Sequence, residues 1–144
     1  MECKTINEIQ VGDQAEMTRT VTLADIYAFA GASMDLNPVH VDPAFAKASI
    51  FGGQVAHGML TASMLSAILG TQLPGVGTIY LGQTIAFTAA VFPGDRLTAS
   101  LVVTEVNREK NRVILEGTVK NQDGKVVLKG ESKVMAPKQR AKLD

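Results

Sequence analysis

Two side chains that can transfer protons, Asp35 and His40, lie five residues apart in a segment that has to turn. They flank the pair Asn37-Pro38, and proline disfavours a helical conformation at the residue before it. Such a turn can bring a carboxylate and an imidazole to one pocket, where they can hold a water molecule, take its proton and return a proton elsewhere. The same spacing is compatible with a structural role, in which Asp35 caps a turn and His40 is a hydrogen-bonded loop residue.

A second candidate site is the helix start at His57-Gly58. A helix N-terminus exposes free backbone N–H groups and carries partial positive charge, and glycine lets a ligand approach the backbone closely. The N–H of Gly58 could therefore polarise a carbonyl whose oxygen becomes negative in a transition state. The alternative is an ordinary helix start in which Gly58 serves packing. We expect His57 to be structural, hydrogen-bonded and neutral.

The helix that begins at Gly58 is predicted to span 58–69 and to end at Gly70. It is almost entirely apolar, and a helix that is apolar on every side is typically buried. Ser66 lies two turns into this helix. From the residues alone we interpret it as a small side chain that lets a sheet pack closely.

An earlier helix and a long loop are expected to carry the Asp35–His40 pair. The helix spans 23–31, with Thr22 as its N-cap and Asp25 completing a capping box, and it is predicted to stop at Gly31. Residues 32–53 contain Asn-Pro, Asp-Pro and Gly-Gly pairs, which are typical of loops.

We expect this loop to contain a single helical turn at 44–48. Asp42 is interpreted as the N-cap of that turn, and Asn37 as a residue that braces the loop rather than one that contacts substrate. A loop of this length in a small domain is more often functional than idle.

The second half of the chain alternates between apolar and polar residues, which is typical of strands in a sheet with one buried and one wet face. Together with an early strand, this predicts an α+β domain in which a five-stranded antiparallel sheet covers one buried helix. The predicted strands span 14–21, 78–89, 96–106, 112–120 and 125–135.

Composition sets limits on function. The chain has 144 residues, of which 46% are hydrophobic and 19% charged, and its formal net charge is zero. This charge balance argues against nucleic-acid binding and against a membrane-surface protein that works by bulk charge. A single cysteine and two histidines make a disulfide, a cysteine metal site or a His-rich zinc site improbable. We expect a cytoplasmic protein, since no stretch approaches the roughly 18 apolar residues of a membrane span.

The motif Asp35-Leu36-Asn37-Pro38-Val39-His40-Val41-Asp42, followed by Ala56-His57-Gly58-Met59, resembles the MaoC-like dehydratase family. Within that family it is most similar to the (R)-specific enoyl-CoA hydratases. The resemblance runs from about residue 11 to 135 and includes the segments 72–75, 79–83 and 91–95. It implies one hot-dog domain over 1–144, with a core at about 11–135, an antiparallel sheet wrapped around a central helix, and a basic tail at 136–144.

The resemblance also implies an activity, namely reversible addition of water to a trans-2-enoyl-CoA to give a (3R)-3-hydroxyacyl-CoA. Asp35 and His40 fall on the family's catalytic pair, with Asp35 favoured as the base toward water. The N–H of Gly58 falls on the donor to the thioester oxygen, and Asn37, His57 and Ser66 are further pocket residues. No metal or organic cofactor is implied, because CoA arrives with the substrate. The implied assembly is a homodimer, in some members paired again.

Three alternatives stay open at this point. A dehydratase acting on acyl carrier protein would have the same fold and the same catalytic pair. A hot-dog thioesterase would use the same helix start, but the Asp35–His40 loop argues against it. A non-catalytic acyl-CoA-binding module would be expected to lack Asp35 or His40. Residues 47–54 depart from the family pattern, so the preferred acyl length is not determined.

Overall fold

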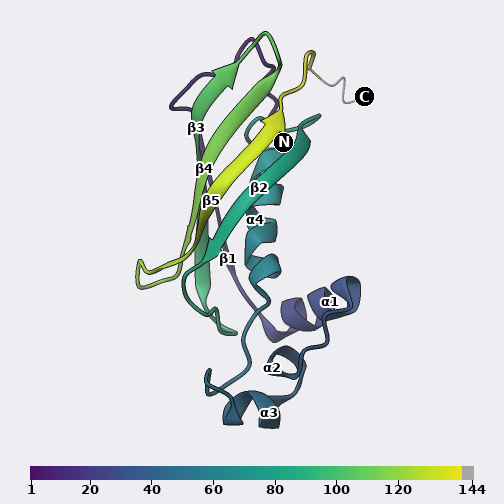
Figure 1. The fold of residues 1–144 in the computed structure, drawn as a ribbon, viewed down its shortest axis with the longest axis vertical. Helices are drawn as coiled ribbons and strands as arrows, with labels where there is room; N and C mark the ends of the chain where they lie inside the picture. Colours follow the sequence, from purple (N-terminus) through teal and green to yellow (C-terminus); the bar gives the residue numbers. More distant parts are fainter. Residues whose placement is uncertain (141–144) are drawn as a thin grey trace.

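A computed structural model describes residues 1–140 as a five-stranded antiparallel sheet with a long helix along one face (Figure 1). The strand order is β1-β3-β4-β5-β2, so β1 and β2 form the two edges. This confirms the predicted α+β architecture. The elements in chain order are β1 (Gln14–Thr20), α1 (Leu23–Ser33), α2 (Pro38–Val41), α3 (Pro43–Ala48), α4 (Gly58–Thr71), β2 (Ile79–Phe87), β3 (Arg96–Asn107), β4 (Arg112–Lys120) and β5 (Val126–Met135).

Apolar and polar residues alternate along the strands, so the apolar side chains lie on one face of the sheet, and this face packs against α4. On β3 the predicted inward residues Leu97, Ala99, Leu101 and Val103 are all buried, while Lys129, Glu131 and Lys133 on β5 are exposed. The core therefore lies between the sheet and α4.

A glycine lets α4 approach the middle of the sheet. A Cβ on Gly117 of β4 would lie 2.9 Å from Leu101 Cδ2 and 3.2 Å from Leu65 Cδ2. Leu65 and Ile68 of α4 are completely buried at this contact surface. Any side chain at Gly117 would push the helix and the sheet apart, which would lose close-packed contacts.

The prediction that α4 is buried on every side is wrong for one stripe. Met59, Ser63, Ser66 and Gly70 are exposed on the single chain. They follow one another at helical spacing, so they form a continuous line along the helix.

Neither of the two glycines that were predicted to end a helix does so. α1 continues beyond Gly31 to Ser33 and is capped by Met34 in the left-handed region, at φ 64°. α4 continues through Gly70 to Thr71. Glycine inside a helix costs only about 1 kcal/mol relative to alanine, so packing of the neighbouring residues decides where these helices end.

The segment predicted as mostly loop contains two short helices, α2 and α3. Each begins with proline at its first position, after Asn37 and Asp42 as N-caps. Proline is favoured at this position because its fixed φ suits a helix start and its missing N–H is not needed there. The capping roles expected of Thr22 with Asp25, and of Asp42, are confirmed.

The first residues of the chain join the core instead of preceding it. Ile6 and Ile9 are buried, and Cys3 forms an isolated antiparallel bridge with Gly75. Of the predicted basic tail, Ala136 is buried and Arg140 forms an ion pair with Glu8, whereas residues 141–144 lie outside the described part. None of the described helices combines the length and apolar character needed to cross a membrane.

Candidate active site

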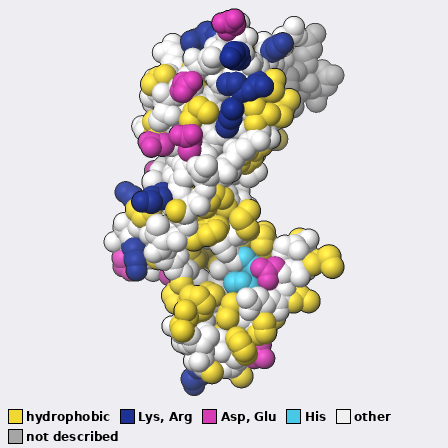
Figure 2. All heavy atoms as spheres, viewed as in Figure 1, with side chains coloured by type: hydrophobic (Ala, Val, Ile, Leu, Met, Phe, Trp, Pro, Cys, Tyr) yellow, Lys and Arg dark blue, Asp and Glu magenta, His cyan; other side chains and the backbone are white. Residues whose placement is uncertain are grey.

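A cavity of about 920 Å³ opens where the N-terminal end of α4 meets α1, α2 and the end of β2. Figure 2 shows a hollow in this region in which histidine and an acidic side chain lie beside hydrophobic surface. The wall is largely apolar and aromatic, and its polar groups are few, as in small-molecule sites generally. The larger apolar lining residues include Phe29, Phe51, Val55, Phe87, Val91 and Val127.

His40 reaches the cavity from α2, a helix that exists because Asn37 and Pro38 start it. The Nδ1 atom of His40 lies 2.7 Å from the carbonyl oxygen of Val55. A carbonyl can only accept, so Nδ1 carries the proton and donates it. The lone pair of the neutral ring is therefore on Nε2, which is left available to a ligand.

Asp35 lies in the exposed turn between α1 and α2. Its side-chain Oδ1 accepts from the backbone N–H of Asn37 at 3.2 Å. Its own N–H donates to Ser33 Oγ at 3.2 Å. These local bonds fix the carboxylate at the mouth of the cavity, whose lining includes both Asp35 and His40.

The two proton-transfer groups face one another as the sequence predicts. A carboxylate oxygen of Asp35, a ring nitrogen of His40 and a ring nitrogen of His57 all lie within 4.8 Å of one another. A water molecule can bridge two polar atoms at such a separation, since each hydrogen bond spans about 2.8 Å. The arrangement can hold one water between an acid and a base.

His57 lies behind this pair and is 2% exposed. Its Nε2 donates to the backbone carbonyl of Asp35 at 2.9 Å. Its ring stacks on the ring of His40, with centroids 3.7 Å apart and planes inclined by 26°. Phe29 of α1 contacts its ring at a tilt, with centroids 4.9 Å apart.

Asp35, His40 and His57 lie close enough together to raise the question of whether they could bind a metal ion. Zinc lies in the plane of each histidine ring at about 2.0–2.1 Å from the nitrogen. Because the two rings are stacked, their in-plane lone pairs run side by side and do not converge on one point. The pair of histidines therefore does not fit a single metal ion.

Gly58 begins α4 and lines the cavity. Within the described residues its backbone N–H donates to no protein acceptor, and no side chain caps the helix start. A Cβ on Gly58 would lie 2.8 Å from Cε1 of Phe87. The Phe87 ring therefore lies where a side chain at position 58 would begin, so a larger residue here would have to displace that ring.

Of the two remaining predicted residues, Asn37 lies at the cavity and Ser66 does not. Asn37 lines the cavity, and its Oδ1 accepts from the N–H of Val39 at 3.3 Å, so it braces the turn as expected. Ser66 is exposed and does not line the cavity of the single chain. It lies eight residues beyond Gly58, which is about 12 Å along the helix.

Gln54 supports the site but was not among the predicted residues. Its Nε2 donates to the carbonyl of His40 at 2.8 Å and to the hydroxyl of Tyr27 at 3.0 Å. It thus ties α1 to α2. No local pattern marks it, because both partners are distant in the sequence.

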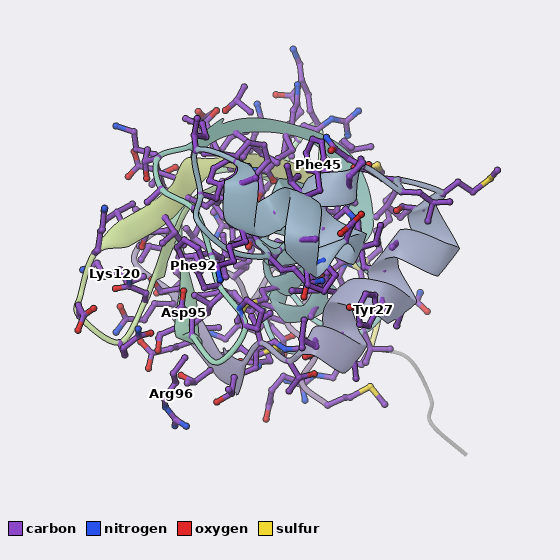
Figure 3. All side chains as sticks on the ribbon, turned by 90° about the horizontal axis from the view of Figure 1, so that it is seen from below. Tyr27, Phe45, Phe92, Asp95, Arg96 and Lys120 are labelled. Carbon is purple, nitrogen blue, oxygen red and sulfur yellow. The ribbon has the colours of Figure 1, made fainter. Side chains whose placement is uncertain are left out.

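Charge around the cavity is sparse. Of the described residues that line it, none is Lys or Arg. Figure 3, which looks from below, shows Arg96 and Lys120 extending from the sheet on the side away from Tyr27 of α1. A positively charged side chain that pairs with an anionic part of a ligand would therefore have to come from outside this lining.

The chain matches the model of the MaoC like domain over residues 5–125. It is 45% identical over 130 residues to an (R)-specific enoyl-CoA hydratase of Rhodospirillum rubrum, covering 90% of each protein. It is 42% identical over 129 residues to an (R)-specific enoyl-CoA hydratase of Aeromonas caviae, covering 90% of this chain and 96% of that protein.

Solved structures agree with these relatives. The unliganded R-hydratase from Pseudomonas aeruginosa superposes with a TM-score of 0.88 at 44% identity, covering 97% of this chain and 93% of that one. The predicted hot-dog fold is thereby confirmed.

Proposed function

The chain belongs to the family of MaoC-like domains, and on that premise we propose that it is a hydro-lyase acting on enoyl-CoA. It adds water reversibly to a trans-2-enoyl-CoA and forms a (3R)-3-hydroxyacyl-CoA. One observation carries the proposal. The Asp35 carboxylate and a ring nitrogen of His40 lie within 4.8 Å of each other, at an apolar cavity whose wall includes the helix start at Gly58.

The geometry of the site supports the following course of the proposed reaction. Water held between Asp35 and His40 loses a proton to Asp35, and its oxygen forms a bond to C3 of the substrate. The electron pair of the double bond moves toward the thioester oxygen. The enolate electron pair then forms a bond from C2 to the proton that Asp35 took from water, which is returned on the same face with the assistance of His40. Both elements of water have then been added, and Asp35 and His40 are back in their starting protonation states. Each acid–base group of this kind typically contributes about 10²–10⁴-fold to the rate.

The N–H of Gly58 stabilises the charge that develops on the thioester oxygen. It is available, because it has no acceptor within the described chain, and the helix start adds partial positive charge. A donor of this type acts more strongly on the enolate-like transition state than on the substrate. It should therefore contribute mainly to turnover.

We propose that no metal or organic cofactor takes part. The stacked rings of His40 and His57 do not direct their lone pairs to one ion. Both chemical roles, proton transfer and charge stabilisation, are filled by groups of the chain. CoA enters as part of the substrate.

We further propose a homodimer, which could pair again, in the cytoplasm. β2 is an edge strand, and its residues Ile79, Tyr80 and Leu81 are 55%, 39% and 42% exposed. Unpaired edges of this kind are normally covered. A second copy that pairs along β2 would lie near the exposed stripe of α4. The single cysteine is compatible with a reducing compartment.

The deciding experiment is an assay of the purified protein with crotonyl-CoA and longer trans-2-enoyl-CoAs, in the presence of EDTA. We expect loss of the ultraviolet absorbance of the conjugated thioester, and a product of (3R) configuration. The same acyl groups on acyl carrier protein form the comparison arm. Absence of turnover on every CoA thioester, or a (3S) product, would contradict the proposal.

A further inference from the structure

We propose that His57 is a positioning residue. It holds the turn that carries the Asp35 carboxylate and the ring of His40 in fixed positions relative to each other. This inference rests on the proposed function, because it concerns how those two groups are kept in place. It goes beyond the expectation that His57 is merely a buried structural histidine. Its basis is that one side chain contacts both members of the pair.

One hydrogen bond from His57 ties the turn that carries Asp35 to the rest of the chain. Among the described residues, every other hydrogen bond made by residues 34–38 stays within the segment 29–42. The bond from His57 Nε2 to the carbonyl of Asp35 is the only one that reaches the rest of the chain. Because residues 33–38 are all exposed, little packing is available to hold this turn when that bond is absent.

The ring of His40 is held by two contacts of different kinds. Its Nδ1–H donates to the carbonyl of Val55, which leaves the ring free to tilt about that bond. Stacking on His57, at 3.7 Å between centroids, limits the tilt. The Nε2 atom of His40 therefore keeps one direction relative to the Asp35 carboxylate.

The hydrogen bonding of His57 argues against a role in packing alone. Its Nε2 carries a proton, because it donates to a carbonyl. Its Nδ1 is buried and has no partner within the described chain, and burying such an atom is unfavourable. A phenylalanine would fill a similar space without that penalty. The position therefore needs a flat ring and an N–H at its far end, and histidine supplies both.

Two substitutions separate the ring from the donor. His57→Phe keeps a flat ring for stacking but removes the N–H, whereas His57→Gln places an amide N–H near the position of Nε2. Asn111→Gly is the matched control. It removes another buried polar side chain, one bonded to Ala136 at the end of the sheet opposite α1–α3.

We expect His57→Phe to lower kcat by about 10- to 100-fold, with KM changed by less than about threefold, because misplacement of reacting groups affects turnover. His57→Gln keeps a donor but lacks the ring that stacks on His40, so its kcat should also fall, by about 10-fold. Amide hydrogen exchange of the peptide covering 33–42 should rise in His57→Phe and stay near the parent rate in His57→Gln. Asn111→Gly should change melting temperature but neither kcat nor exchange in that peptide.

The proposal is overturned if folded His57→Phe keeps the parent kcat and the parent exchange rate. It is also overturned if exchange in the peptide covering 33–42 rises as much in His57→Gln as in His57→Phe, since the donor would then not anchor the Asp35 turn. Hydrogen exchange keeps this test separate from the assignment of activity. If the parent protein hydrates no enoyl-CoA, the proposed function fails, yet faster exchange in His57→Phe alone would still support the anchoring of the Asp35 turn.

Discussion

At the scale of single residues, the proposed chemistry depends on two side chains, Asp35 and His40, that the short helix α2 and the turn before it bring to one cavity. We predict that Asp35→Asn and His40→Gln each lower kcat/KM for hydration by about 10²–10⁴-fold, the usual effect of losing an acid–base group. Both variants should fold, because Asp35 is exposed and His40 is only partly buried. Hydration rates are measured from the loss of ultraviolet absorbance of the conjugated thioester. The samples compared are those whose far-ultraviolet circular dichroism spectra match that of the parent.

Asp42→Asn is a suitable control for this pair. Asp42 belongs to the same segment but caps α3 and does not line the cavity. Asparagine is as good an N-cap as aspartate, so the control should keep the parent activity. Near-parent activity in either Asp35→Asn or His40→Gln would remove that residue from the catalytic pair.

Gly58 allows a sharper test than the sequence suggests, because its missing side chain has a known neighbour. We predict that Gly58→Val lowers the melting temperature through collision with the Phe87 ring. It should also lower kcat/KM at least tenfold per folded molecule, or about 1.4 kcal/mol, because the substrate carbonyl can no longer reach the N–H.

The double variant Gly58→Val/Phe87→Ala separates the two effects. Removing the ring should recover melting temperature, while the valine still crowds the helix start. Phe87→Ala alone corrects for the loss of the ring from the cavity wall. If the double variant regains the activity of Phe87→Ala, then Gly58 serves packing only, and the role of its N–H as a donor to the thioester oxygen is lost.

At the scale of elements, α1 is held in place by the capping box at its start. Thr22 Oγ1 accepts from the N–H of Asp25, and the Asp25 carboxylate accepts from the N–H of Thr22. We predict that Thr22→Ala lowers the free energy of unfolding by about 1 kcal/mol, measured by urea denaturation at neutral pH. A change below experimental error would show that α1 is held by packing alone.

The stability that this capping box contributes should also decrease at acidic pH. The backbone N–H of Thr22 and then the guanidinium of Arg19 lower the pKa of the Asp25 carboxyl below its ordinary value. A lowered pKa in the folded state adds stability above the ordinary value of about 3.9, and that stability is lost as the pH falls through the folded pKa. The stability difference between the parent and Asp25→Asn should therefore shrink below about pH 4.

The elements that could be predicted from the sequence are those whose signals are local. The bounds of β4 follow from alternation, and the start of α1 from its capping box. The same kind of signal was present for α2 and α3, as Asn-Pro and Asp-Pro pairs, but a proline after a cap residue is compatible with a loop or a helix start. Helix ends were harder to predict, because tertiary packing carries α1 and α4 through Gly31 and Gly70.

The same distinction holds for the candidate site, where only residues with a local sequence signal could be predicted. Asp35, His40 and Gly58 could be proposed because each lies in a motif of consecutive residues. Gln54 and Phe87 could not, because their roles come from contacts made across the fold with His40, Tyr27 and Gly58. Nor could the sequence predict that His57 stacks on His40, since the ring geometry depends on how α2 packs against the start of α4.

At the scale of the whole molecule, the open edge at β2 predicts self-association. We expect light scattering at micromolar concentration to give at least twice the chain mass of 15.3 kDa. Leu81→Lys should weaken the dimer by placing a charge on the exposed edge strand. Val102→Lys is the matched control, because Val102 is exposed on β3, between β1 and β4 in the sheet. A monomeric parent, or equal dissociation in both variants, would contradict pairing along β2.

The pairing of β1 with β3 bears on how the chain is made. Thr18 pairs with Thr98 across 80 residues, and α4 lies between these strands in the chain. During synthesis the apolar surface of α4 therefore emerges before β3 and β4, which pack against it together with β1 and β2. Long-range pairing of this kind is slow to form, and exposed apolar surface favours aggregation of nascent chains. Val127 of β5 also lines the cavity, so the cavity can be completed only after translation has passed β5, and until β3 and β4 are made the apolar surface of α4 is only partly covered.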